Sequence, residues 1–157
     1  MQMHIDGMIR RLAERTPDEI LAFDERYRRY VAQAYRWDLW GAIYWLGGGC
    51  SDGGFWNARC LLVSLGQERL ARILNNPDEL ADLASEPGVF NRQSDWQSEG
   101  FQYVATKAYQ KKTGHLPPWG ENSPPDKPAG EPFDFQDREL MQRRFPRIVA
   151  KYPEMGD

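Results

Sequence analysis

The sequence predicts an all-α fold, arranged as a single compact helical domain over residues 1–157. Apolar residues recur at steps of three or four, which is the spacing of one helix face. Two helix-start signals of the same kind, TPDE at 16–19 and NPDE at 76–79, precede such runs. No segment shows the period-two alternation of a half-buried strand. We expect a long central helix, short helical hairpins and a Pro/Gly-rich segment before the last helix.

The longest helix is expected in the first third of the chain. Residues 1–15 form an N-terminal helix or arm, and Thr16 caps the helix that follows. Apolar positions then continue to the glycines at 47–49, which predicts one uninterrupted helix up to that point. The positions on its inner face are Ile20, Phe23, Tyr27, Val31, Ala34, Asp38, Gly41 and Trp45.

Shorter helices follow, separated by glycine and proline. Ser51 or Asp52 caps a helix that runs to Gly66, residues 67–75 form a short helix, and Asn76 caps the next. Ser94 with Gln97 opens a helix that stops at Gly114. Six of the 11 prolines lie between 117 and 132, so residues 115–133 are a Pro-rich wrap or linker. Asp134 caps a C-terminal helix over 134–153, which Pro146 kinks or restarts.

The composition excludes several classes of function. A net charge of −3 argues against a nucleic-acid partner, because phosphate binding needs a clustered basic excess. No run approaches 18 apolar residues, so we expect no membrane span. Two cysteines suit a reducing compartment, and the first residues lack a secretory pattern. We therefore expect a cytoplasmic protein.

One segment, residues 35–56, has an unusual composition. Four of the six tryptophans and six of the 14 glycines lie between Trp37 and Trp56. Each glycine inside a helix costs about 1 kcal/mol against alanine, so close packing or a special turn should compensate. Function is therefore most readily sought in this segment.

The same segment resembles the hallmark of a bacterial family, the domain-of-unknown-function family 4240. The likeness consists of WDLWGA at 37–42, GGCSD at 48–52, Gly54-Phe55 and Arg59. Further blocks agree at 17–20, 76–80, 103–109 and 144–147, and Gly53 stands where the family pattern has a second Asp. The resemblance implies the helical fold and a cytoplasmic location, and it implies no activity.

Asp38 and Asp52 in the segment, and Arg59 just after it, are charged residues that invite a pairing. Asp38 falls on the apolar stripe, where a carboxylate needs a partner, and Arg59 falls on the inner side of the next helix. We expect Arg59 to pair with Asp38 or Asp52. Such a pair has two possible roles. It either fixes the angle of a helical hairpin, or it forms the base of a polar ligand pocket whose sides are Trp37, Trp40 or Trp56.

The glycine turn that contains Cys50 and Ser51 offers weaker chemistry. A helix N-terminus can bind an anion, but this turn follows no strand and lacks the lysine of a phosphate-binding loop. A helix N-terminus lowers thiol pKa values, which makes Cys50 a candidate nucleophile, yet the two histidines, His4 and His115, are far away in sequence. No standard zinc spacing exists, and Asp6, Asp38 and Asp52 lack helical ligand spacing, so we expect no metal and no cofactor.

Two classes of function remain open. The first is a binding or interaction module, namely an adaptor, a regulator or a toxin-neutralising protein, with a protein partner or a small polar ligand. The second is a small enzyme or biosynthetic accessory protein that uses Asp38, Asp52 and Arg59 in a Trp-lined pocket. The candidate ligand-binding residues are Trp37, Asp38, Trp40, Cys50, Ser51, Asp52, Trp56 and Arg59.

Overall fold

The computed structural model describes residues 2–86, 100–118 and 125–154, and its regular structure there is helical. The α-helices are α1 (Gln2–Ala13), α2 (Pro17–Gln33), α3 (Trp37–Gly47), α4 (Asp52–Ser64), α5 (Gln67–Asn75), α6 (Leu80–Leu83), α7 (Val104–Thr113), α8 (Arg138–Arg144) and α9 (Pro146–Lys151). Two short 3₁₀ helices, η1 (Pro77–Glu79) and η2 (Phe101–Tyr103), precede α6 and α7. The predicted all-α fold is confirmed.

Several predicted helix starts are confirmed by their caps. The Thr16 side chain accepts a hydrogen bond from the Glu19 amide at 3.2 Å, and the Glu19 carboxylate accepts from the Thr16 amide at 2.8 Å. The Ser51 hydroxyl accepts from the Gly54 amide at 3.1 Å and so caps α4. The expected cap formed by Ser94 and Gln97 lies outside the described residues.

The cap predicted for the C-terminal helix is wrong. Asp137, not Asp134, caps α8 and accepts from the Leu140 amide at 3.0 Å. Asp134 accepts instead from the Gln136 amide at 2.8 Å, which forms a turn before the helix. The break expected at Pro146 is present, because α8 ends at Arg144 and α9 begins at Pro146.

The predicted long helix is interrupted, and this changes where Asp38 lies. α2 ends at Gln33 and α3 begins at Trp37, with Arg36 in an extended conformation between them. The linker pairs with the Pro-rich segment: the Ala129 amide donates to the Tyr35 carbonyl at 2.8 Å, and the Trp37 amide donates to the Ala129 carbonyl at 3.0 Å. These distant backbone bonds replace helical ones, so Asp38 lies in the first turn of a new helix.

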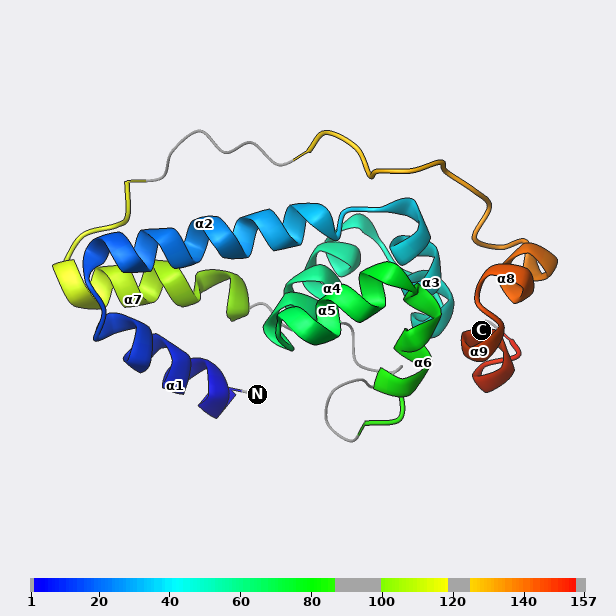
Figure 1. Ribbon diagram of the computed structural model, residues 1–157, viewed down its shortest axis with the longest axis horizontal. Coiled ribbons are helices and arrows are strands. Elements are labelled where there is room, and N and C mark those ends of the chain that lie inside the picture. Colours follow the sequence, from blue (N-terminus) through cyan, green and yellow to red (C-terminus); the bar gives the residue numbers. More distant parts are fainter. Residues whose placement is uncertain (1, 87–99, 119–124, 155–157) are drawn as a thin grey trace.

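The described helices form two groups that meet along α2 and α4 (Figure 1). At one end α1 and α7 pack on the first half of α2 around Ile20, Ala105 and Ala108. The larger core is built by α3 to α6 together with α8 and α9, and includes Leu39, Leu62 and Ile148. A small cluster of Tyr27, Val31 and Cys60 lies where the two groups meet. This junction positions the candidate site.

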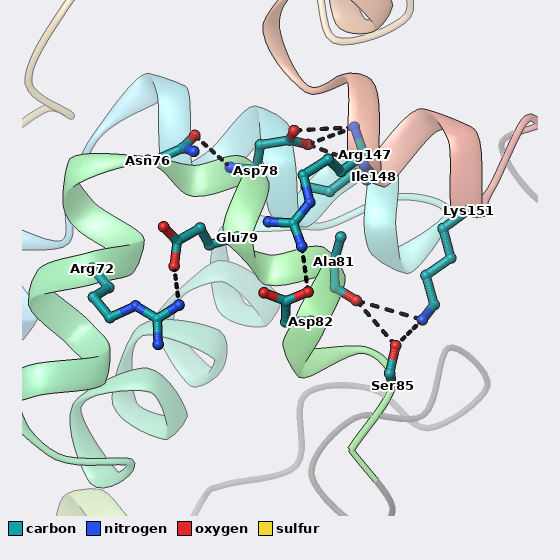
Figure 2. Close-up of polar contacts among 10 residues, drawn as sticks. All are labelled: Arg72, Asn76, Asp78, Glu79, Ala81, Asp82, Ser85, Arg147, Ile148 and Lys151. Atoms are coloured by element: carbon teal, nitrogen blue, oxygen red, sulfur yellow. Dashed lines mark hydrogen bonds and ion pairs between the residues drawn. The ribbon is translucent and has the colours of Figure 1, made fainter.

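A buried carboxylate holds the C-terminal helices against the larger core (Figure 2). Asp78, on η1, accepts hydrogen bonds from the backbone amides of Arg147 and Ile148 at 3.0–3.1 Å. These amides belong to the first turn of α9, where a negative charge is favourable. At the surface, the Arg147 side chain pairs with Asp82. Because the Asp78 oxygens are satisfied by backbone donors, this cluster is structural.

Candidate functional site

The hallmark tryptophans lie in an aromatic cluster that the chain closes itself. Trp37 and Trp40 stack with ring centroids 5.4 Å apart, and Trp40 stacks on Phe55 at 4.8 Å. Phe135, from the segment that follows the Pro-rich stretch, packs on both tryptophans at 6.1 and 6.2 Å. The Trp40 indole N–H donates to the Cys50 carbonyl at 3.2 Å. The rings therefore pack against one another at the edge of the larger core, where Trp37, Trp40 and Phe135 are half-buried.

Close packing accounts for Gly41. A Cβ atom at this position would lie 2.5 Å from Cζ of Phe133 and 3.2 Å from Cδ1 of Phe135. Glycine is therefore required because the two rings sit directly on the backbone of α3.

Left-handed backbone conformations account for two further glycines. Gly48 ends α3 with φ of 73°, and Gly49 follows with φ of 128°. The Gly49 amide donates to the Tyr44 carbonyl at 2.8 Å, which closes the last turn of the helix. These glycines thus serve packing and turning of the chain.

The expected ion pair between Arg59 and Asp38 or Asp52 is wrong. Asp38 pairs with Arg36, which also donates to the Leu74 carbonyl at 2.9 Å. Asp38 is half-buried at the start of α3, where its oxygen accepts from the Leu39 amide at 2.8 Å. Asp52 is exposed in the first turn of α4. The interruption of the long helix explains the error, because it removes Asp38 from the stripe that faces Arg59.

Arg59 is buried among aromatic rings, with 6% of its surface exposed. Its guanidinium carbon lies 4.3 Å from the ring centroid of Tyr35, 5.0 Å from Phe55 and 5.1 Å from Trp56. Nη1 donates to the Val31 carbonyl at 3.0 Å, and Nε is buried without a hydrogen-bond partner. No carboxylate pairs with Arg59 in the described part of the chain. Burial lowers the pKa of Arg59, which is the expected response to such surroundings.

A cavity of about 700 Å³ opens beside this arginine, between α2, α4 and η2 with the start of α7. Its volume falls within the range of small-molecule sites in proteins. Trp56 forms one wall, and its indole N–H donates to the Gln102 side chain at 3.0 Å. Pro125, from the Pro-rich segment, also lines it. The residues that line the cavity include Asp24, Tyr27, Val31, Trp56, Arg59 and Gln102.

Two further polar groups face the cavity from α2. Asp24 is 4% exposed and pairs with Arg28 at 2.5 Å; burial raises the pKa of its carboxyl group. The Tyr27 hydroxyl is buried beside the Cys60 thiol, and burial raises its pKa strongly. Burial also raises the pKa of the neighbouring Cys60 thiol. The cavity therefore combines apolar surface with several charged and polar side chains, of which Asp24, Tyr27 and Arg59 are buried.

Sequence reasoning found Trp56 and Arg59 but missed the α2 side of the cavity. A signal for Asp24 existed, because Ile20, Asp24, Tyr27 and Val31 share one helix face at steps of four, three and four. A carboxylate on an otherwise apolar face marks a buried polar group. Gln102 gave no comparable signal, because its position depends on the packing of η2 against α4.

A second hollow, of about 710 Å³, lies between α1, α2 and α7. Arg11, Glu14 and Arg15 line it and are exposed to solvent, beside Leu12 and Phe23. The described lining residues include no buried polar atom without a partner. It is therefore the weaker candidate.

No cluster of three or more His, Cys, Asp or Glu side chains suitable for a metal ion is found among residues 2–86, 100–118 and 125–154. Over the same ranges, no helix is both long and apolar enough to span a membrane.

Comparison with known proteins returns one family. The model of a family described as "Protein of unknown function (DUF4240)" matches residues 2–111. None of the curated proteins and none of the solved structures matches the chain. The matched residues contain Trp37 and Trp40, but not Phe135, together with α2, α4 and η2, which form most of the wall of the Arg59 cavity.

Proposed function

The chain belongs to the family described as "Protein of unknown function (DUF4240)", and we propose that it acts as a ligand-binding module whose site is the cavity between α2, α4 and η2. The proposal specifies a small molecule as the ligand. One observation carries it: the cavity opens beside a buried arginine that no described carboxylate neutralises.

The energetics favour a binding site over an ordinary core position. A buried charge without a counter-ion costs several kcal/mol, and each ring contact returns about 0.5–2 kcal/mol. Arg59 has three such contacts and one carbonyl acceptor, but it leaves Nε unsatisfied. A folded chain tolerates such an arrangement where function requires it.

Binding is favoured over catalysis because the suggested catalytic set is dispersed. Asp38 has Arg36 as its partner, Asp52 is exposed, and Arg59 turns to the Val31 carbonyl on α2. Asp24 is the buried carboxylate at the cavity and so the best candidate for a catalytic carboxylate, but it is paired with Arg28. No nucleophile and base stand in hydrogen-bond contact in the described part of this cavity.

A plugged cavity provides the test. Ala32 lines the cavity on α2, and Ala22 is an exposed alanine on the same helix. A fragment library is screened against the wild-type chain, Ala32→Trp and Ala22→Trp by ligand-observed NMR. We expect fragments that bind the wild-type chain and Ala22→Trp but not Ala32→Trp. If no fragment binds, or if Ala32→Trp binds the same fragments, the proposed function is wrong.

A further inference from the structure

We propose that the Arg59 cavity recognises a monocarboxylate, with the carboxylate received by Arg59 and the apolar body of the ligand held against Trp56; this inference rests on the function proposed above. Three features support this: the unsatisfied donors of Arg59, the charge balance of the cavity and the chemistry of its walls.

The arginine has donors to spare. A guanidinium carries five N–H donors in a rigid planar fork, which matches the two oxygens of a carboxylate. In the described structure only Nη1 has an acceptor, the Val31 carbonyl, and Nε is buried without one. The three flanking rings fix the guanidinium between them, so it is held ready for a ligand.

The charge balance of the cavity calls for one negative charge. Both acidic residues at the cavity pair with an arginine one turn further along α2: Asp24 with Arg28 at 2.5 Å, and Glu25 with Arg29 at 3.0 Å. Arg59 is the charge that remains without such a pair among the described lining residues. A monoanion neutralises it.

A carboxylate fits better than a phosphate. A phosphate group carries up to two negative charges and needs several donors. Here it would meet one arginine at the inner wall, together with the carboxylates of Asp24 and Glu25. A singly charged group meets less of this repulsion and needs fewer donors than a phosphate.

The walls indicate an apolar body. Trp56, Tyr27 and Val31 face the cavity, and the space exceeds what a small inorganic anion fills. Concave sites of this kind hold the apolar part of a ligand by area and its polar group by a few directed bonds. Aryl and medium-chain alkyl carboxylates have this form.

Matched pairs of probes test the inference on the wild-type chain. Benzoate, naphthoate and octanoate are compared with benzamide, naphthamide and octanamide by calorimetry, with inorganic phosphate as a further probe. We expect at least one carboxylate to bind about tenfold or more tightly than its amide, because a hydrogen bond to a charged group is stronger than one to a neutral group. We expect phosphate to show no binding.

A variant pair assigns the effect to one residue. Arg59→Gln should abolish the preference for the carboxylate, whereas Arg69→Gln, at an exposed arginine of α5 paired with Glu86, should keep it. An unchanged preference in a folded Arg59→Gln chain would overturn the inference.

The inference and the proposed function fail in different ways. If no carboxylate binds more tightly than its amide, or phosphate binds best, the monocarboxylate is wrong. If the amides bind the wild-type chain and do not bind Ala32→Trp, the proposed function is still supported. The comparison of probes needs only the wild-type chain, so it holds even if Arg59→Gln does not fold.

Discussion

Two regions of the molecule combine tryptophan with charge, and they differ in whether the chain completes them. The cluster of Trp37 and Trp40 is covered by Phe135, and the neighbouring Asp38 has Arg36 as its partner. The cavity beside Trp56 is open, and Arg59 has no carboxylate within the described ranges. The difference shows that an unusual composition can reflect tight packing. The buried polar group without a partner, Nε of Arg59, lies next to the packed cluster.

If this comparison is right, substitutions in the cluster of Trp37 and Trp40 lower stability and leave ligand binding intact. Substitutions in the cavity beside Trp56 weaken ligand binding and leave stability intact. Phe55 is shared by both regions, since it stacks on Trp40 at 4.8 Å and lies 5.0 Å below the guanidinium of Arg59. Phe55→Ala should therefore lower the free energy of unfolding by about 3–5 kcal/mol and weaken carboxylate binding as well. Urea denaturation and calorimetry measure the two effects. A loss below about 1 kcal/mol would show that the regions do not meet at Phe55.

The second variant removes the contact that holds α9 against the larger core. Asp78→Ala leaves the Arg147 and Ile148 amides without their acceptor, which should cost about 2–4 kcal/mol. The C-terminal helices should loosen, so amide exchange in α9 should accelerate and acrylamide should quench tryptophan fluorescence more strongly. The control is Asp82→Asn, at the exposed pair with Arg147, which should cost less than about 1 kcal/mol. Equal effects of the two variants would contradict the structural role of Asp78.

The third variant tests the packing explanation of the glycines. Gly41→Ala gains up to about 1 kcal/mol of helix propensity, but its Cβ meets Phe133, so we expect a net loss of about 1–3 kcal/mol. Gly53→Ala on α4 meets nothing within 4 Å and should be neutral or slightly stabilising. Thermal denaturation compares them. Carboxylate binding should survive in both variants, and a stable Gly41→Ala chain that loses binding would place the site at α3.

The fourth variant separates function from stability in the cavity. Arg59→Met keeps an unbranched side chain among the rings and removes a buried charge, so stability should stay within about 1 kcal/mol of wild type or rise. Carboxylate binding should fall about tenfold or more. A loss of about 3 kcal/mol or more in denaturation would mean that Arg59 serves the fold.

The smallest expected effect is the pH dependence due to Asp24. Burial raises the pKa of its carboxyl group above the ordinary value of 3.8, so the folded state holds this proton more tightly than the unfolded state. The charged form therefore costs stability above the raised pKa, and this cost disappears as the pH falls through it toward 3.8. Relative to Asp24→Asn, the wild-type chain should gain stability from about pH 7 to about pH 3. A difference in the free energy of unfolding between the two chains that does not change with pH would contradict this.

Local signals predicted much of the fold. Cap chemistry at Thr16 and Ser51 and the helical spacing of apolar residues depend on neighbours within one or two turns, and these features are confirmed. The break between α2 and α3 could not be predicted in this way, because it is stabilised by backbone bonds to Ala129, far along the chain. The partner of Asp38 was missed for the same reason.

The candidate site was predictable in part. Trp56 was identified because it lies in the segment of unusual composition, and Arg59 because it belongs to the family hallmark and falls on the inner side of the next helix. The expected acidic partner was wrong, since a rule that a buried arginine needs a carboxylate ignores aromatic rings and carbonyl oxygens as alternatives. The position of Gln102 depends on how η2 packs against α4, which no local pattern encodes. Asp24 could have been predicted, because it lies on the apolar face of α2.

The central claim is that ligand binding belongs to the cavity beside Trp56 and not to the cluster of Trp37 and Trp40. Indole N–H signals in NMR report on each directly, because Trp56 donates to Gln102, Trp40 to the Cys50 carbonyl and Trp45 to the Tyr152 carbonyl. The signals are assigned with Trp→Phe variants, and naphthoate is then titrated into the wild-type chain. The account predicts that the Trp56 signal shifts while those of Trp40 and Trp45 stay in place. A shift of the Trp40 signal with an unmoved Trp56 signal would contradict it.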